Sequence, residues 1–161
     1  PLSQLENETQ VWALLAWMLQ LRGAQINRFL KQWKTSNELI RHVTATVRVL
    51  SMLDSTGVDR IILFEAGADN VANAVRVAQI LGHDERGWLD TYQMLQIKSP
   101  KELAVTGKDL IANQIVTPGP QMGRILNSLK TMVINDQLPN QPEALFTAAR
   151  KLGKDDWEWK H

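Results

Sequence analysis

The sequence predicts an all-α protein, a bundle of short helices. Apolar residues recur at intervals of three and four along most of the 161 residues, which is the spacing of one face of a helix. Glycines follow several of these segments, and hydroxyl or amide side chains precede others, as helix ends require. No run of four or more residues alternates between apolar and polar in the manner of a strand.

Glycines and capping residues mark the ends of the helices in the first part of the chain. Gly23 is expected to close the first helix, because a left-handed residue is usual at that position. Thr35 and Glu38 are expected to form a capping box for the third helix, and Gly57 is expected to end it. The predicted helices of this part cover residues 11–21, 26–33, 36–53, 59–65, 71–81 and 84–97.

The later helices begin at clear signals. Ser99 to Glu102 reads as a second capping box, with proline at the first helical position, where no N–H is lost. Another helix follows Pro120. The last is expected to begin at Asn140, capped with Glu143, and to end at Gly153.

Ser99 is the expected seam between two helical subdomains, because capping, proline and a change of charge coincide there. The sequence thus predicts a body subdomain over residues 1–98 and a tail subdomain over residues 99–161. The ending around Trp157 and Trp159 is short, charged and aromatic, which fits either a frayed tail or tryptophans that dock on a surface.

Composition excludes several classes of function. There is no cysteine, so disulfides and thiolate metal sites are excluded, and a reducing cytoplasm is the expected compartment. No apolar run approaches the ~20 residues that a membrane span needs. The chain begins at Pro1 rather than methionine, so we expect it to be part of a longer protein.

The net charge of +1 conceals an uneven distribution. Residues 22–48 carry six bases and one acid, residues 54–90 carry three bases and seven acids, and residues 98–154 carry eight bases and four acids. Two basic segments therefore flank an acidic one, and a nearly neutral total can hide a basic face.

The sequence offers little for catalysis. His42, His83 and His161 are far apart, and none has a second histidine at helical spacing with which to share a metal ion. His42 is expected to be a surface or half-buried residue rather than a ligand. There is no glycine-rich phosphate loop. We expect no catalytic residue, no metal site and no cofactor within this chain.

The third predicted helix is better suited to binding a polyanion. Arg41 and Arg48 are seven residues apart and share a stripe opposite the apolar face that holds Val43 and Val47. Charges opposite a core are usual on any solvated helix, but the run between Arg22 and Asp54 is nearly free of acids, whereas ordinary surfaces mix both signs. The further cations of this segment are Arg28, Lys31 and Lys34.

Pro118-Gly119-Pro120 predicts a second anion site. Proline at the first helical position leaves backbone N–H groups free at the end of the helix, Gly119 lets a phosphate approach the main chain, and Arg124 lies one turn in. The alternative is that the prolines build a tight corner and that Gly123 makes a close helix contact. The residues alone leave both interpretations open.

Several motifs together resemble one family. These are Gly107-Lys108-Asp109-Leu110, then Pro118-Gly119-Pro120 with Gly123 and Ile125-Leu126, and then Asn140-x-x-Glu143-x-Leu145. In that order they are similar to the C-terminal region of bacterial CCA-adding enzymes, the tRNA nucleotidyltransferases. Phe29-Leu30-x-x-Trp33-Lys34-x-Ser36-Asn37 is similar to the helical body of the same family.

The resemblance implies a tRNA-binding body and tail. Members of the family rebuild the CCA end of tRNA from CTP and ATP with Mg²⁺, which is expected in an N-terminal catalytic head whose motifs this chain lacks. The implied partners are tRNA and that head, and a homodimer is a further alternative. Lys34, Lys108 and Arg124 fall on or beside the matching motifs. Gln121-Met122 departs from the aromatic–aliphatic pair that the family usually has, and Asn135-Asp136 departs from its glycine-containing turn.

Three other functions stay open. Helix, proline–glycine corner and helix resemble a helix-hairpin-helix, which would grip the backbone of DNA. Apolar helix faces could instead form a protein-interaction or oligomerisation module. A stand-alone enzyme is a third reading, and it needs a site that the sequence does not provide.

Overall fold

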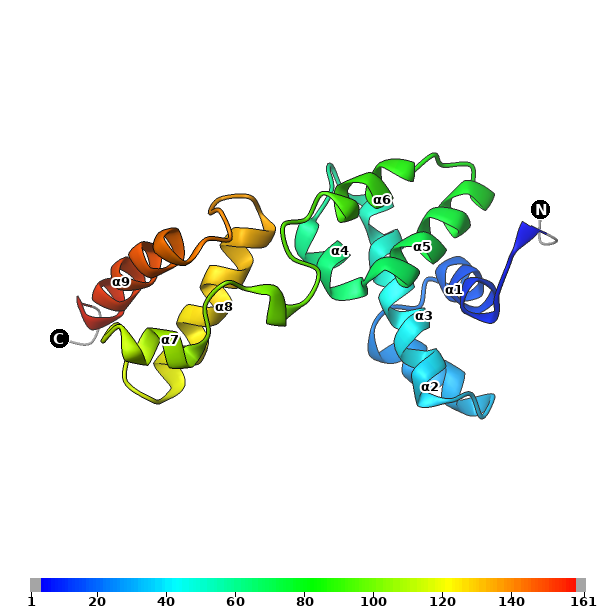
Figure 1. The fold of residues 1–161 in the computed structure, drawn as a ribbon. Helices are drawn as coiled ribbons and strands as arrows, with labels where there is room; N and C mark the ends of the chain where they lie inside the picture. Colours follow the sequence, from blue (N-terminus) through cyan, green and yellow to red (C-terminus); the bar gives the residue numbers. More distant parts are fainter. Residues whose placement is uncertain (1–3, 159–161) are drawn as a thin grey trace. The chain divides into compact units, whose positions relative to one another are not determined.

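The structure, a computed structural model, describes residues 4–158, with side chains up to residue 154. Its described residues form nine α-helices and short 3₁₀ turns and no strand, which confirms the all-α prediction (Figure 1). The chain divides into two compact units, unit 1 (Pro1–Met94) and unit 2 (Leu95–His161). The sequence-based boundary between residues 98 and 99 stays a prediction about domains.

Unit 1 is built around its third helix, which packs against four others. Val43, Val47 and Leu50 are almost fully buried there, as the spacing predicted for this face. Each such side chain contributes about 1.5–3 kcal/mol through burial. The helices are α1 (Glu8–Met18), α2 (Ala24–Gln32), α3 (Asn37–Leu50), α4 (Arg60–Ala66), α5 (Ala68–Ile80) and α6 (Arg86–Gln93), with the 3₁₀ turn η2 (Ser51–Asp54) after α3.

The buried face of α1 differs from the one that apolar spacing suggests. Val11, Leu15 and Met18 are exposed, whereas Ala13 and Leu14 are buried. The helix is apolar on all sides, so spacing alone does not select the face that packs. Its outward face is an unpartnered apolar surface among the described residues.

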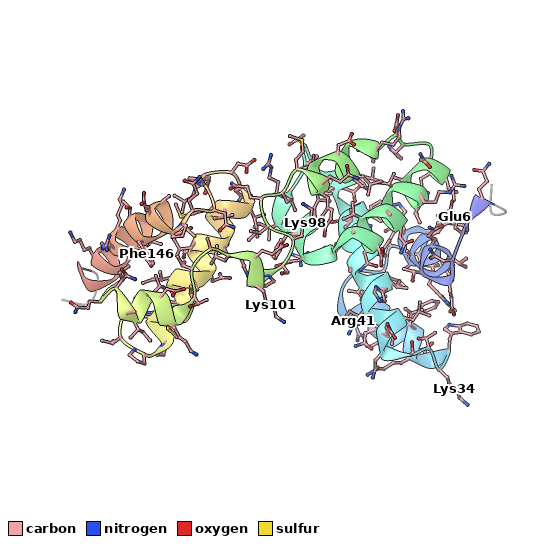
Figure 2. The ribbon with its side chains drawn as sticks, viewed as in Figure 1. Glu6, Lys34, Arg41, Lys98, Lys101 and Phe146 are labelled. Atoms are coloured by element: carbon pink, nitrogen blue, oxygen red, sulfur yellow. The ribbon has the colours of Figure 1, made fainter. Side chains whose placement is uncertain are left out.

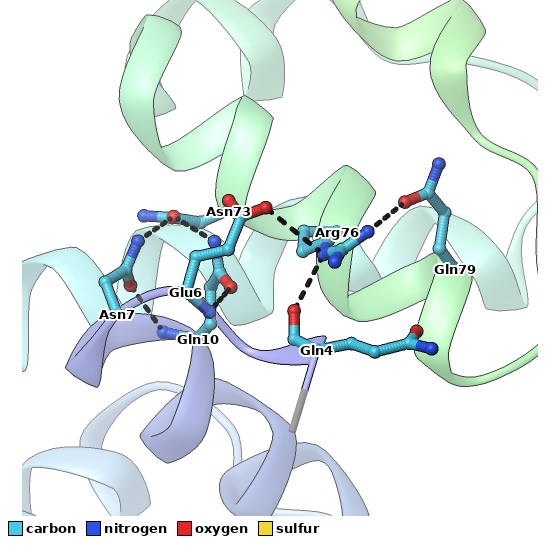
Figure 3. Close-up of polar contacts among 7 residues, drawn as sticks. All are labelled: Gln4, Glu6, Asn7, Gln10, Asn73, Arg76 and Gln79. Carbon is cyan, nitrogen blue, oxygen red and sulfur yellow. Dashed lines mark hydrogen bonds and ion pairs between the residues drawn. The ribbon is translucent and has the colours of Figure 1, made fainter. Parts of the chain in front are cut away.

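Residues from α5 hold the beginning of α1 in place (Figure 3). Asn7 caps α1 by accepting a hydrogen bond from the N–H of Gln10 at 3.0 Å. The side chain of Gln10 is 2% exposed, and its amide donates to Asn73 at 3.0 Å, so this buried polar group is satisfied. Arg76 donates to the carbonyl of Gln4 at 2.9 Å.

Three helix ends in unit 1 differ from the sequence-based expectation. Gly57 does not end α3, because α3 ends at Leu50 and the 3₁₀ turn η2 follows it. Gln20, with φ of 56°, takes the left-handed position that closes α1, and Gly23 instead precedes α2. Ser36 is the N-cap of α3, where its hydroxyl accepts from the N–H of Leu39 at 3.1 Å. Thr35 instead donates to the carbonyl of Leu30, so the predicted capping box of Thr35 with Glu38 was wrong.

Unit 2 is a smaller helical assembly in which α7 and α9 pack on α8. Leu110, Leu129 and Leu145, one from each helix, are fully buried. The described elements are the 3₁₀ turn η3 (Pro100–Glu102), α7 (Gly107–Ala112), α8 (Pro120–Ile134) and α9 (Pro142–Glu158). The predicted end at Gly153 was wrong, because α9 continues past it. The prediction about Trp157 and Trp159 concerns side chains outside the described residues.

Asn140 does not cap the last helix as expected. Its side chain accepts from the N–H of Ala104 at 2.8 Å and donates to the carbonyl of Glu102 at 2.8 Å. These bonds fix the end of η3 and the segment that follows it against the loop between α8 and α9. Asn140 is therefore a tertiary anchor, which no local spacing could indicate.

Candidate nucleic-acid interface

A groove of about 570 Å³ opens in unit 1 where α2, α3 and α4 meet. Apolar side chains, among them Ile40, Ala45 and Ile62, form part of its lining. Polar and charged side chains complete it. They are Asn27 from α2, Asn37, Arg41, Thr44 and Arg48 from α3, and Glu65 from α4.

The stripe predicted on α3 faces this groove. Arg41 is exposed and has no hydrogen bond or ion pair among the described residues. Arg48 differs, because its guanidinium donates to the carboxylate of Glu65 at 2.5 Å. The charge of Arg48 is thus locally balanced, whereas the charge of Arg41 is available to an anion.

A second stripe of polar and basic side chains runs along α2. Asn27 lines the groove, and Lys31 follows it four residues later, on the same side of the helix. Lys34 lies just beyond the end of α2, in a turn with φ of 55°. Lys31, Lys34 and the nearby Arg28 are exposed and have no partner among the described residues (Figure 2 labels Lys34 and Arg41). The stripes of α2 and α3 together form a cationic surface, which we call the α2–α3 surface.

The beginning of α8 is the second predicted anion site. Gly119 precedes the helix with φ of 153°, and Pro120 occupies the first helical position. The N–H of Met122 is already used, because it donates to the carbonyl of Gly119 at 3.1 Å. A Cβ on Gly119 would meet no atom within 4 Å, so the backbone is open to solvent. Arg124 is exposed one turn further on.

In this region Gly107, rather than Gly123, makes the close packing contact. A Cβ on Gly123 would meet nothing within 4 Å, so the interpretation of Gly123 as a close helix contact was wrong. A Cβ on Gly107 would lie 2.6 Å from the sulfur of Met122. Gly107 therefore allows the side chain of Met122 to pack against the start of α7.

Lys108 is exposed in the first turn of α7, whose beginning is firmly capped. The hydroxyl of Thr106 accepts from the N–H of Asp109, and the carboxylate of Asp109 accepts from the hydroxyl and the N–H of Thr106, both at 2.7 Å. These hydrogen bonds, that of the hydroxyl first, lower the pKa of Asp109. The backbone that carries Lys108 is thus held in one conformation.

The surroundings of His42 and the grouping of potential metal ligands can be described for the residues that the structure covers. His42 is half-buried, and its Nδ1 lies 3.1 Å from the side-chain oxygen of Asn70. In the part of the chain that the structure describes, no three His, Cys, Asp or Glu side chains gather in a way that could hold a metal ion. His42 is a half-buried residue with a hydrogen-bond partner, as the sequence suggested.

Sequence reasoning missed three members of the groove, which are Asn27, Asn37 and Glu65. Asn27 and Asn37 carry no charge, so a search for basic residues does not find them. Glu65 is 17 residues from Arg48, so only the fold brings the two side chains together. The spacing of Asn27 from Lys31 was the one signal that could have found a member of this set.

None of the helices between residues 4 and 158 is both long enough and apolar enough to cross a membrane.

The fold and the α2–α3 surface define a class of protein, an all-α domain with a cation-lined groove. The comparisons then identify its family. Residues 3–149 match the family model of tRNA nucleotidyltransferase domain 2, and the chain belongs to this family. The resemblance seen in the sequence is thereby confirmed.

The curated relatives that the chain matches are longer proteins. The CCA-adding enzyme of Pediococcus pentosaceus is 57% identical over 156 residues, which cover 97% of this chain and 39% of that protein. The CCA-adding enzyme of Lactiplantibacillus plantarum is 40% identical over 156 residues, covering 94% and 38%. The chain therefore spans about two fifths of the length of these relatives.

A solved structure shares the fold. The crystal structure of the CCA-adding enzyme of Bacillus stearothermophilus in complex with CTP aligns with a TM-score of 0.78 and 24% identity. The alignment covers 96% of this chain and 40% of that one.

Proposed function

We propose that this chain is the tRNA-binding C-terminal part of a CCA-adding tRNA nucleotidyltransferase. It grips the backbone of the acceptor and T arms while an N-terminal head adds CMP and AMP to the 3′ end. The head would use CTP, ATP and Mg²⁺, and the protein would work in the cytoplasm. Membership of the family and the CCA-adding activity named for the relatives support this role.

The observation that carries the proposal is the α2–α3 surface. Arg28, Lys31, Lys34 and Arg41 are exposed cations without partners among the described residues. Arg28, Lys31 and Arg41 lie on two packed helices beside a groove, and Lys34 lies in the turn that follows α2. Cations in this state can pair with phosphates without first breaking an ion pair. Each phosphate contact also releases counterions from the RNA, which favours binding.

This arrangement suits a protein that must bind every tRNA. Phosphate contacts position a nucleic acid without reading its sequence. The base edges of an RNA duplex lie in a groove too deep and narrow for side chains, so such duplexes are recognised through backbone, 2′-hydroxyls and shape. Arginine and lysine on exposed helices provide that kind of contact.

Unit 2 is proposed to supply further phosphate contacts. Gly119 would let a phosphate approach the open backbone before α8, and Lys108 and Arg124 would add charge. Arg48 is proposed to join the contacts of unit 1 when a phosphate competes with Glu65 for its guanidinium.

The experiment is a binding titration of this chain with labelled tRNA and with duplex DNA of similar length, followed by fluorescence anisotropy. The proposal expects tighter binding of tRNA and a loss of affinity in Arg41→Ala. Arg86→Ala is the matched control, because Arg86 is an exposed arginine whose charge is already paired with Asp84 at 2.6 Å. Equal or tighter binding of the DNA would favour the helix-hairpin-helix function instead.

The outward face of α1 favours a second candidate, association with protein. Val11, Leu15, Met18 and Leu19 are exposed on this face, and an apolar patch of this kind is typical of interaction sites. Sedimentation of the wild-type chain and of Met18→Glu over a range of concentrations tests this candidate. A homodimer through α1 would dissociate in the variant, and a monomeric wild type would contradict it.

A further inference from the structure

Three aromatic side chains form a cluster where α1 packs near the end of α2. The ring centroid of Trp12 lies 6.3 Å from that of Phe29 and 6.1 Å from that of Trp33, and the rings of Phe29 and Trp33 are 6.4 Å apart. Trp33 is nevertheless 63% exposed. Since aromatic rings of this size usually bury most of their surface, the cluster offers an open aromatic face at Trp33.

The charged residues next to Phe29 and Trp33 in the sequence are all basic. Arg28 precedes Phe29, Lys31 lies between Phe29 and Trp33, and Lys34 follows Trp33. Residues 9–37 include no acid at all. Glu8, the acid before this run, accepts a hydrogen bond from the indole N–H of Trp12 at 3.3 Å. Along the sequence, the aromatic residues of α2 and its end therefore alternate with cations of the α2–α3 surface.

The other exposed apolar surface of unit 1 differs in chemistry. On α1 the outward side chains Val11, Leu15 and Met18 are aliphatic, and no base lies between Glu8 and Met18. An aliphatic face suits another apolar protein surface. Aromatic rings among unpaired cations suit a polyanion that also carries flat π faces, which is a nucleic acid with unpaired bases.

We propose that the aromatic cluster of Trp12, Phe29 and Trp33 is a stacking site for an unpaired RNA base, with Arg28, Lys31 and Lys34 holding the adjoining phosphates. This inference rests on the proposed function, because the phosphate contacts bring RNA to the cluster. Trp33 supplies the exposed ring, while Trp12 and Phe29 fix its position. Stacking tolerates any base, since every base has a π face, so the site fits a protein that serves many RNAs.

The test compares three labelled RNAs of one design. The first is a blunt duplex, the second carries a short single-stranded extension, and the third carries an extension of the same length without bases. The two extensions add the same phosphates, so their difference in affinity isolates stacking. The wild-type chain should bind the extension with bases about tenfold more tightly than the abasic one.

Trp33→Ala should remove this difference and leave the affinity for the blunt duplex and its salt dependence unchanged, because indole carries no charge. Trp33→Phe keeps a ring and should retain part of the difference. Met18→Ala is the control, since Met18 is 68% exposed on the aliphatic face of α1. Circular dichroism of each variant checks that the helices are retained.

Equal binding of the two extended RNAs by the wild type would overturn the stacking site while leaving the phosphate contacts standing. An equal effect of Met18→Ala and Trp33→Ala on the extension with bases would also overturn it, because a general apolar surface would then be responsible. The blunt duplex could fail to bind at low salt while the extension with bases still binds better than the abasic one. That result would contradict only the proposed phosphate contacts and would leave the stacking site standing.

Discussion

The α2–α3 surface of unit 1 and the beginning of α8 in unit 2 were both predicted as anion sites, but they are built in different ways. The first gathers side-chain charges from α2, α3 and the turn after α2, beside a groove, and apart from Arg48 those cations have no partner among the described residues. The second depends on an open backbone at Gly119, whose φ of 153° the fold itself requires. Substitutions on the α2–α3 surface should therefore change RNA affinity without changing the free energy of unfolding. Substitutions at the beginning of α8 should change both.

Reversal of the charge of Arg41 should give the largest loss of tRNA affinity, and it tests the α2–α3 surface of unit 1. Arg41→Glu should weaken tRNA binding about a hundredfold, because a charged hydrogen bond is lost and a repulsion is added. The melting temperature should stay unchanged, since Arg41 is exposed and unpaired among the described residues.

Arg124→Glu is the matched reversal in unit 2. It should weaken binding less, because fewer cations surround Arg124 in sequence than surround Arg41. Anisotropy titrations of both variants measure the two effects. A larger loss for Arg124→Glu would move the main phosphate contact to unit 2.

Substitutions of Gly119, just before α8, and of Gly123, within it, should separate the effect of backbone conformation from the effect of an added side chain. Gly119→Ala should destabilise the protein by about 1–3 kcal/mol, because alanine rarely adopts this backbone conformation. Gly123→Ala should stabilise it by about 1 kcal/mol, because an added Cβ meets open space within the helix. Urea unfolding of both variants gives the values, and a neutral Gly119→Ala would show that this corner needs no glycine.

Removing the partner of Arg48 should raise affinity. Glu65→Gln frees the guanidinium that now binds the carboxylate, and exposed ion pairs of this kind contribute about 0.2–1 kcal/mol, so we expect tRNA to bind about threefold more tightly. The double variant Glu65→Gln with Arg48→Ala should lose that gain. Unchanged affinity in Glu65→Gln would exclude Arg48 from the phosphate contacts.

A pH effect on stability should be the smallest, and it concerns unit 2. Hydrogen bonds from Thr106 lower the pKa of Asp109, and the N–H groups of Lys98 and Ser99 lower that of Glu102. A carboxylate with a lowered pKa stabilises the fold above its ordinary pKa, and this contribution disappears as the pH falls through the lower folded value.

Asp109→Asn should therefore be less stable than the wild type at pH 7 and equal to it in acid, below both pKa values. Urea midpoints measured from neutral pH down to about pH 2.5 follow the difference. A gap of the same size at both ends of the range would show that the carboxylate charge plays no part in this cap.

Local signals predicted most of the fold, and long-range pairing explains what they missed. The helix predicted over residues 59–65 corresponds to α4, which Asp59 caps and Gly67 ends, and Gly82 follows the end of α5 with φ of 90°. The buried face of α1 was not predictable, because apolar residues surround that helix. For the candidate site, the exposed positions of Arg41 and Arg48 followed from spacing alone. The pairing of Arg48 with Glu65 and the meeting of Trp12 with Trp33 depend on tertiary packing.

The salt dependence of tRNA binding tests the central claim most directly. The logarithm of the affinity should fall linearly with the logarithm of the salt concentration, with a slope of about −0.7 to −0.9 per phosphate neutralised. Arg41→Ala should reduce the slope by about one phosphate, whereas Arg86→Ala should leave it unchanged. A wild-type slope near zero, or the same change of slope in both variants, would contradict a phosphate grip by the α2–α3 surface.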